Sequence, residues 1–147
     1  MLKNAMTGLV LVAALGTAWA QNTPIGKWQS IDDKTKEAKA EITITEVAGA
    51  LSGKITKRLL KDAKPEDVCD DCKDARKGKP ILGLEIIRGG KKEDGADVWT
   101  GGKILDPENG KEYTLKMTPE DGGKKLAVRG YVGNPMFGRT QTWVRVE

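Results

Sequence analysis

The sequence predicts an all-β fold: a single antiparallel, up-and-down barrel of eight strands with one long loop. Short runs of alternating apolar and polar residues, the pattern of half-buried strands, recur along the chain. Most runs are separated by short turns rich in Gly, Asp, Asn and Pro, which favours antiparallel neighbours. Glycines inside the runs suit strongly bent strands, and closing the sheet removes its exposed edges. We therefore expect a barrel, with a two-sheet sandwich as the alternative.

The first four expected strands lie before residue 90. The second of them shows the alternation most clearly, with Ile42 and Ile44 on one face and Thr43 and Thr45 on the other. A cluster of charged residues follows the first strand, and Gly49 marks the turn between the second and third. The expected ranges are 26–31, 38–46, 50–59 and 81–88.

The last four expected strands are 98–105, 111–117, 124–132 and 139–146. A turn is expected at 106–110, because Pro107 presets one backbone dihedral and Asn109-Gly110 tolerates positive φ. A second turn is expected at 118–123. In the seventh run Leu126, Val128 and Val132 form the apolar face.

The connection over residues 60–80 is long, charged and without a strand pattern. Pro65 is placed to begin a short helix there, and Gly78 and Pro80 to end it. The connection also holds the pair Cys69 and Cys72. We expect these cysteines to form a disulfide that shapes the loop and stabilises it by about 2 kcal/mol.

A redox pair and a metal site are the alternatives for the two cysteines. The intervening aspartates, Asp70 and Asp71, disfavour the thiolate that a catalytic pair needs. The sequence offers no further soft ligand for a metal, so we expect no metal site.

The first twenty residues are typical of an export signal. Lys3 precedes an apolar run over residues 5–16, and Ala18-Trp19-Ala20 is a small-x-small cleavage pattern. We expect cleavage between Ala20 and Gln21, with residues 21–147 forming one barrel domain. The apolar run is too short for a permanent membrane span, and no second one follows. The expected location is periplasmic or secreted.

Composition excludes several functional classes. The net charge is +4, yet basic and acidic residues are interleaved, so we expect no nucleic-acid partner. The chain contains no histidine, which excludes Ser-His and Cys-His nucleophiles and histidine general bases. We expect no catalytic residues and no cofactor, and the sequence names no protein partner.

The expected function is binding of a small hydrophobic or amphipathic molecule inside the barrel. Aromatic and aliphatic side chains on the strands are the candidate ligand-binding residues: Trp28, Ile42, Ile44, Leu84, Ile86, Trp99, Tyr113, Leu115, Val128 and Trp143. Lys103, Arg129 and Tyr131 are candidate contacts for a polar head, although alternation favours outward positions for Arg129 and Tyr131. Two alternatives remain: an envelope interaction module with a packed interior, and a thiol-redox protein using the cysteine pair.

Several segments carry a resemblance to known families. Gly26-Lys27-Trp28 resembles the Gly-x-Trp signature of lipocalins, in which an arginine covers the tryptophan at the barrel base; the resemblance implies that role here for Arg139 or Arg145. Over residues 25–146 the chain resembles the exported bacterial family called domain of unknown function twenty-one forty-seven (DUF2147). That resemblance implies a lipocalin-like barrel outside the cytoplasm, with no established reaction and a small hydrophobic ligand as the usual expectation. It rests on the segments 26–28, 69–72, 80–84, 99–107, 128–131 and 138–143.

Overall fold

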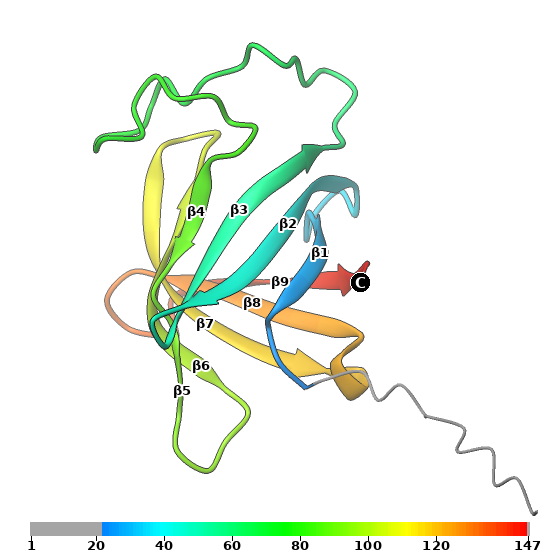
Figure 1. Ribbon diagram of the computed structural model, residues 1–147, viewed down its shortest axis with the longest axis vertical. Coiled ribbons are helices and arrows are strands. Elements are labelled where there is room, and N and C mark those ends of the chain that lie inside the picture. The colour runs from blue at the N-terminus through cyan, green and yellow to red at the C-terminus, as the bar shows by residue number, and fades with distance from the viewer. Residues whose placement is uncertain (1–21, 147) are drawn as a thin grey trace, which may run out of the picture.

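The computed structural model describes residues 22–146, and Figure 1 shows their strands wrapped into one barrel with a long connection above it. One 3-10 turn, η1 (Asp121–Gly123), lies between β7 and β8, and these described residues include no α-helix. Nor do they include a helix long and apolar enough to cross a membrane. The strands are β1 (Gly26–Ile31), β2 (Ala38–Val47), β3 (Ala50–Arg58), β4 (Glu85–Arg88), β5 (Lys91–Lys92), β6 (Trp99–Asp106), β7 (Lys111–Glu120), β8 (Lys125–Tyr131) and β9 (Gly138–Arg145).

The strands form one closed antiparallel sheet. Chain neighbours pair from β1 to β4 and from β6 to β9, while β1 pairs with β9 and β4 with β6. The two-residue β5 also pairs with β6, so β4 and β5 are two pieces of one barrel strand. The expected eight-stranded, up-and-down barrel is therefore confirmed.

Glycines cause the break between β4 and β5. Gly89 and Gly90 have φ values of 79° and 90°, which residues with a β-carbon rarely adopt. On the facing strand, a β-carbon added to Gly102 would lie 2.7 Å from the backbone nitrogen of Gly90. The barrel wall is therefore drawn together at this point, and only glycine fits on the β6 side.

The two ends of the barrel differ. We call the end with the β2–β3 turn, η1 and the last residues of β9 the closed end, and the end with the β6–β7 turn and the long loop the open end (Figure 1). At the closed end Trp28 is fully buried, and its Nε1 donates to the carbonyl of Pro24 at 2.7 Å. The guanidinium of Arg145 lies 4.2 Å from the centre of the indole ring. Arg145, and not Arg139, therefore covers the base.

Two local expectations were wrong, each for a definable reason. The strand β7 continues through Pro119 to Glu120, and the turn follows at η1. The pairing of β6 with β7 ends at Met117, so no carbonyl of β6 requires a hydrogen bond from residue 119. A proline, which has no backbone N–H, is therefore tolerated there. The short helix expected from Pro65 does not form, because Val68 pairs with Pro80 in an antiparallel bridge and Cys69 donates its N–H to the carbonyl of Lys79, which holds the chain extended here.

A third difference is at the start of β4. The run expected as a strand over 81–88 is a strand only from Glu85, and residues 81–83 form a bend and turn instead. Gly83 adopts φ 88° and donates its N–H to the carbonyl of Ile55. The returning chain is thus anchored on β3 before it joins the sheet.

Candidate functional site

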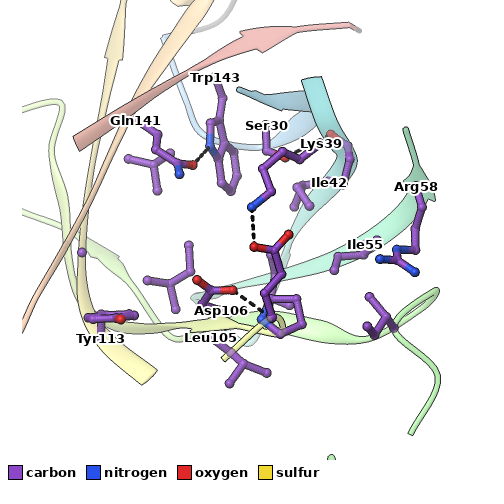
Figure 2. A pocket seen from close by; sticks show the side chains of 18 of the residues that line it. Ser30, Lys39, Ile42, Ile55, Arg58, Leu105, Asp106, Tyr113, Gln141 and Trp143 are labelled. Atoms are coloured by element: carbon purple, nitrogen blue, oxygen red, sulfur yellow. Dashed lines mark hydrogen bonds and ion pairs between the residues drawn. The ribbon is translucent and has the colours of Figure 1, made fainter. Parts of the chain in front are cut away.

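A cavity of about 220 Å³ lies inside the open end of the barrel (Figure 2). Strand alternation turns apolar side chains from several strands toward it. The volume is below the roughly 300 Å³ from which most ligand pockets start, so the cavity suits a small molecule or part of a larger one. Its apolar wall includes Ile42, Ile55, Ile86, Ile104, Val128 and Trp143.

Half of the ten residues expected to bind ligand line this cavity: Ile42, Ile86, Tyr113, Val128 and Trp143. The other five are largely or fully buried but are not among its lining residues: Trp28, Ile44, Leu84, Trp99 and Leu115. Alternation in the sequence identifies which face of a strand points inward. It does not tell how far along the barrel axis a residue lies, and this height separates the two groups.

Charged residues at the open end are the part of the site that sequence reasoning missed. Lys39, Arg58, Asp106, Glu108 and Arg139 all contribute to the cavity lining. They lie at strand ends or in a turn, where the hydrophobic pattern that reveals the wall carries no information. The only signal available was that these positions flank predicted turns.

Three ion pairs hold most of these charges in place. Lys39 Nζ lies 2.9 Å from Glu108 Oε2, and both residues line the cavity. This pair joins β2 to the β6–β7 turn, although β2 and β6 are not neighbours in the sheet. Arg58 lies 2.5 Å from the carboxylate of Asp67 in the long loop.

The third pair joins β9 to the β1–β2 connection. Arg139 Nε donates to Asp33 Oδ2 at 2.8 Å, and a second guanidinium nitrogen contacts the other carboxylate oxygen. The hydrogen bond from Arg139 lowers the pKa of the Asp33 carboxyl below its usual value. All three cations that line the cavity are therefore already paired with carboxylates of the chain.

Polar groups also reach into the cavity below its mouth. Trp143 Nε1 donates to Gln141 Oε1 at 3.1 Å, which orients both side chains on β9. Tyr113, on β7, points its ring into the same space (Figure 2). A molecule in the cavity therefore meets an apolar wall with a few polar groups at one side, the usual composition of a small-molecule site.

The candidate head-group contacts lie outside the cavity lining. Arg129 donates to the carbonyl of Pro135 at 2.7 Å, and Lys103 to the hydroxyl of Thr114 at 3.0 Å. The outward position expected for Arg129 agrees with this geometry. Val132, expected on the apolar face, is exposed instead, because β8 ends at Tyr131 and the chain turns away.

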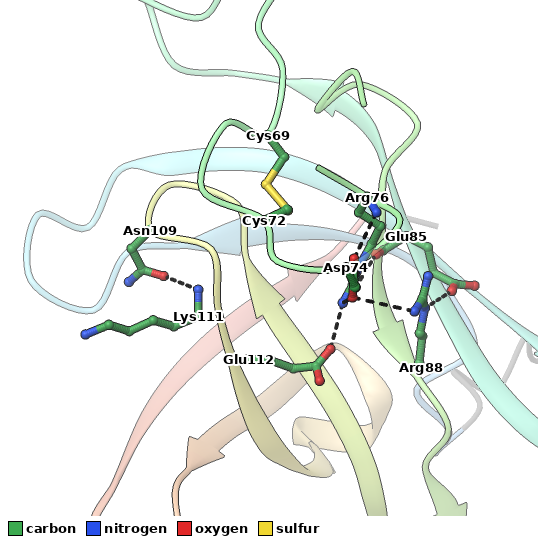
Figure 3. A network of polar contacts seen from close by, with 9 residues as sticks. All are labelled: Cys69, Cys72, Asp74, Arg76, Glu85, Arg88, Asn109, Lys111 and Glu112. Atoms are coloured by element: carbon green, nitrogen blue, oxygen red, sulfur yellow. Dashed lines mark hydrogen bonds and ion pairs between the residues drawn. A yellow bond between two sulfur atoms is a disulfide. The ribbon is translucent and has the colours of Figure 1, made fainter. Parts of the chain in front are cut away.

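The long loop is fixed to the outside of the barrel by a polar network (Figure 3). Arg76 is only 5% exposed and donates to the backbone carbonyl of Glu85 at 2.9 Å. Its NH2 group also lies 2.6 Å from Asp74 and 2.7 Å from Glu112 on β7. The side-chain and backbone hydrogen bonds from Arg76 hold the pKa of the Asp74 carboxyl well below its usual range.

The disulfide lies in the same loop and confirms the expected pairing of Cys69 with Cys72. Both residues are buried, and the adjoining backbone packs closely on the β6–β7 turn. A β-carbon at Gly110 would lie 1.9 Å from the carbonyl oxygen of Asp71, so the loop requires glycine there. The residues that the structure describes contain no group of three or more acidic or cysteine side chains placed to hold a metal ion.

Comparisons with known proteins agree with this architecture. The family model of DUF2147, described as an uncharacterised protein conserved in bacteria, matches residues 26–145. Protein HP1028 of the human pathogen Helicobacter pylori, a member of the lipocalin family, has a similar structure, with a TM-score of 0.73 and 16% sequence identity. The match covers 86% of this chain and 85% of that one. No curated protein is significantly similar to the chain in sequence.

Proposed function

Since the chain belongs to the DUF2147 family and folds as a lipocalin-like barrel, we propose that it binds a small apolar or amphipathic molecule inside the open end. The observation that carries the proposal is the cavity of about 220 Å³, with its aliphatic and aromatic wall and its charged mouth. The fold is compatible with such a role but does not imply it, because one fold hosts many functions.

In this proposal the long loop forms part of the rim. Leu60 and Ile81, near its two ends, contribute to the cavity lining. The Arg76 network and the disulfide hold the segment between them against the barrel. A rim that is already ordered loses less conformational entropy when a ligand binds, which favours affinity.

A titration followed by tryptophan fluorescence tests the binding proposal. Trp143 lines the cavity, whereas Trp28 and Trp99 do not. Octanol added to the protein should change the fluorescence saturably and raise the melting temperature by mass action. The fluorescence change should disappear in Trp143→Phe while the rise in melting temperature remains.

A matched pair of variants locates the binding. Val128→Phe places a ring in the cavity and should abolish octanol binding, whereas Val144→Phe makes the same change at a position that is 43% exposed and outside the lining. Equal affinities in the two variants, or no saturable signal in the unaltered protein, would contradict the proposal.

Export completes the proposed function, and the expected signal and its cleavage site lie outside the described residues. The disulfide supports it, since such bonds persist in oxidising compartments. Intact-mass measurement of the protein from a bacterial envelope fraction should give the mass of a chain that begins at Gln21. A chain retaining residues 1–20 in that fraction would refute this part of the proposal.

An interaction module is the second candidate, and one observation favours it. Met136 and Phe137, in the β8–β9 connection, are 82% and 80% exposed. Adjacent apolar side chains at that exposure are often contact points for a partner. A thiol-redox role has less support, because both cysteines are buried while thiol–disulfide exchange requires an accessible sulfur.

A further inference from the structure

Asp106 differs from the other charged residues that line the cavity. Lys39, Arg58 and Arg139 each form an ion pair with a carboxylate of the chain, and Glu108 is the partner of Lys39. Among the described residues 22–146, no side chain forms an ion pair with Asp106, although Lys111 is its cross-strand neighbour and Arg139 lies close enough to interact with its charge. Each of these three ion pairs is neutral. The charged residues of the lining, taken together with their ion-pair partners, therefore carry one net negative charge, that of Asp106.

The backbone fixes the direction of this carboxylate. In the β6–β7 pairing Ile104 is opposite Tyr113 and Asp106 is opposite Lys111. Alternation therefore turns Asp106 toward the same side as Ile104, a residue of the cavity wall. Oδ1 accepts the backbone N–H of Glu108 at 2.9 Å, and Figure 2 shows the second oxygen turned into the cavity.

We propose that the natural ligand carries a protonated amine, which pairs with Asp106 while its short apolar part contacts the wall at Ile42, Val128 and Trp143. This inference rests on the proposed function and names the ligand class for that site. A cationic head meets Asp106 without displacing any group of the protein. An anionic head would have to share a cation with Glu108, Asp67 or Asp33, whose negative charges would repel it.

The surroundings of Asp106 suit an ammonium group. Such a group has three N–H donors and no acceptor, so it needs oxygen atoms around it. The carboxylate supplies one, and two residues whose side chains carry acceptor oxygens, Tyr113 and Gln141, line the same cavity. Hydrogen bonds between charged groups are about twice as strong as neutral ones. The site should therefore bind an amine head group more tightly than a neutral or an anionic one.

The experiment compares three probes with the same chain: octylamine, octanol and octanoate, titrated calorimetrically into the protein near neutral pH. Octylamine should bind on the order of ten-fold more tightly than octanol, the gain expected from one charge-assisted pair. Octanoate should bind more weakly than octanol. Tighter binding of octanoate than of octylamine would overturn the inference.

Asp106→Asn assigns the effect to one residue. The asparagine carbonyl can still accept the N–H of Glu108, so the turn is kept and only the charge is removed. Octylamine affinity should fall to that of octanol, while octanol affinity stays unchanged. Asp94→Asn makes the same change in net charge at an exposed site in the β5–β6 connection and should have no effect.

The possible outcomes separate the two proposals. If octanol and octylamine bind equally, or if Asp106→Asn weakens both by the same factor, the amine inference fails while the binding function stands. If none of the three probes binds to the unaltered protein, the proposed function fails and the inference fails with it. A melting temperature of Asp106→Asn equal to that of the unaltered protein shows that the variant is folded.

Discussion

The closed and open ends of this barrel are held by different forces. At the closed end Trp28 is fully buried, bonded to Pro24 and covered by Arg145. At the open end Lys39 and Glu108 meet in a partly exposed ion pair above a cavity of about 220 Å³. Apolar burial of a large side chain stabilises strongly, whereas an exposed ion pair contributes little. One end therefore secures the fold, and the other stays accessible.

The largest expected effect follows from removing the aromatic at the closed end. Trp28→Ala deletes a fully buried ring and should lower the free energy of unfolding by about 3–5 kcal/mol. Val144→Ala, on the outer face of β9, should change it by less than about 0.5 kcal/mol. Urea denaturation measures both. A small loss in Trp28→Ala would mean that the closed end does not dominate stability.

The loop network should come next. Arg76→Met removes the donor to the Glu85 carbonyl and the partner of Asp74 and Glu112, and should cost about 1–3 kcal/mol. Its main effect should be local: proteases should cut within residues 59–84 faster than in the unaltered protein, while circular dichroism of the barrel is unchanged. Equal cleavage rates would show that other contacts hold the loop.

The same network should make the loop sensitive to acid. Because the pKa of Asp74 is lowered in the folded protein, its contribution is fully present above the pKa of an unfolded aspartate, about 3.9. The contribution is lost as the pH falls through the lower folded value. The protection of the loop amides against hydrogen exchange, relative to the rate of an unstructured peptide at the same pH, should therefore be high near pH 5–7 and should fall below about pH 4. Arg76→Met should abolish this pH dependence.

Sequence reasoning predicted the barrel because period-two alternation and turn residues both depend on local chemistry. The 106–110 turn and the inward face of β2 were found in this way. It failed at Pro119, where the absence of a β6 partner allows a proline in a strand. It also failed at Pro65, where the pairing of Val68 with Pro80 holds the chain extended in place of a helix. Both depend on residues that come together only in the fold.

The candidate site was predicted only in part, for a related reason. Alternation marks Trp28 and Trp143 equally as inward, yet one closes the barrel base and the other lines the cavity. Depth along the barrel axis depends on strand register and stagger, which sequence patterns do not contain. Lys39 and Glu108 are 69 positions apart in the sequence, so their ion pair at the cavity mouth is a consequence of barrel closure alone.

The disulfide should matter less to global stability than Arg76. Replacing Cys69 and Cys72 together by serine opens a very small ring and should cost at most about 2 kcal/mol in the loop-entropy model. We expect the barrel to remain folded by near-ultraviolet circular dichroism, with faster hydrogen exchange confined to the loop. Complete unfolding of the double variant would show that the loop is part of the folding core.

The smallest expected effect on stability concerns Lys39 and Glu108. Their side chains are 24% and 52% exposed, so Glu108→Gln should change the free energy of unfolding by less than about 1 kcal/mol.

The pair nevertheless crosses the entrance of the cavity, so its loss should speed the entry and release of octanol. In stopped-flow fluorescence the unaltered protein should exchange octanol faster as salt rises, because salt screens the pair. Glu108→Gln should be fast at every salt concentration, whereas Glu93→Gln, at the far end of the barrel, should keep the salt dependence. If Glu108→Gln retained the slow, salt-dependent exchange, the ion pair would not control access, and the difference between the two ends would be one of stability alone.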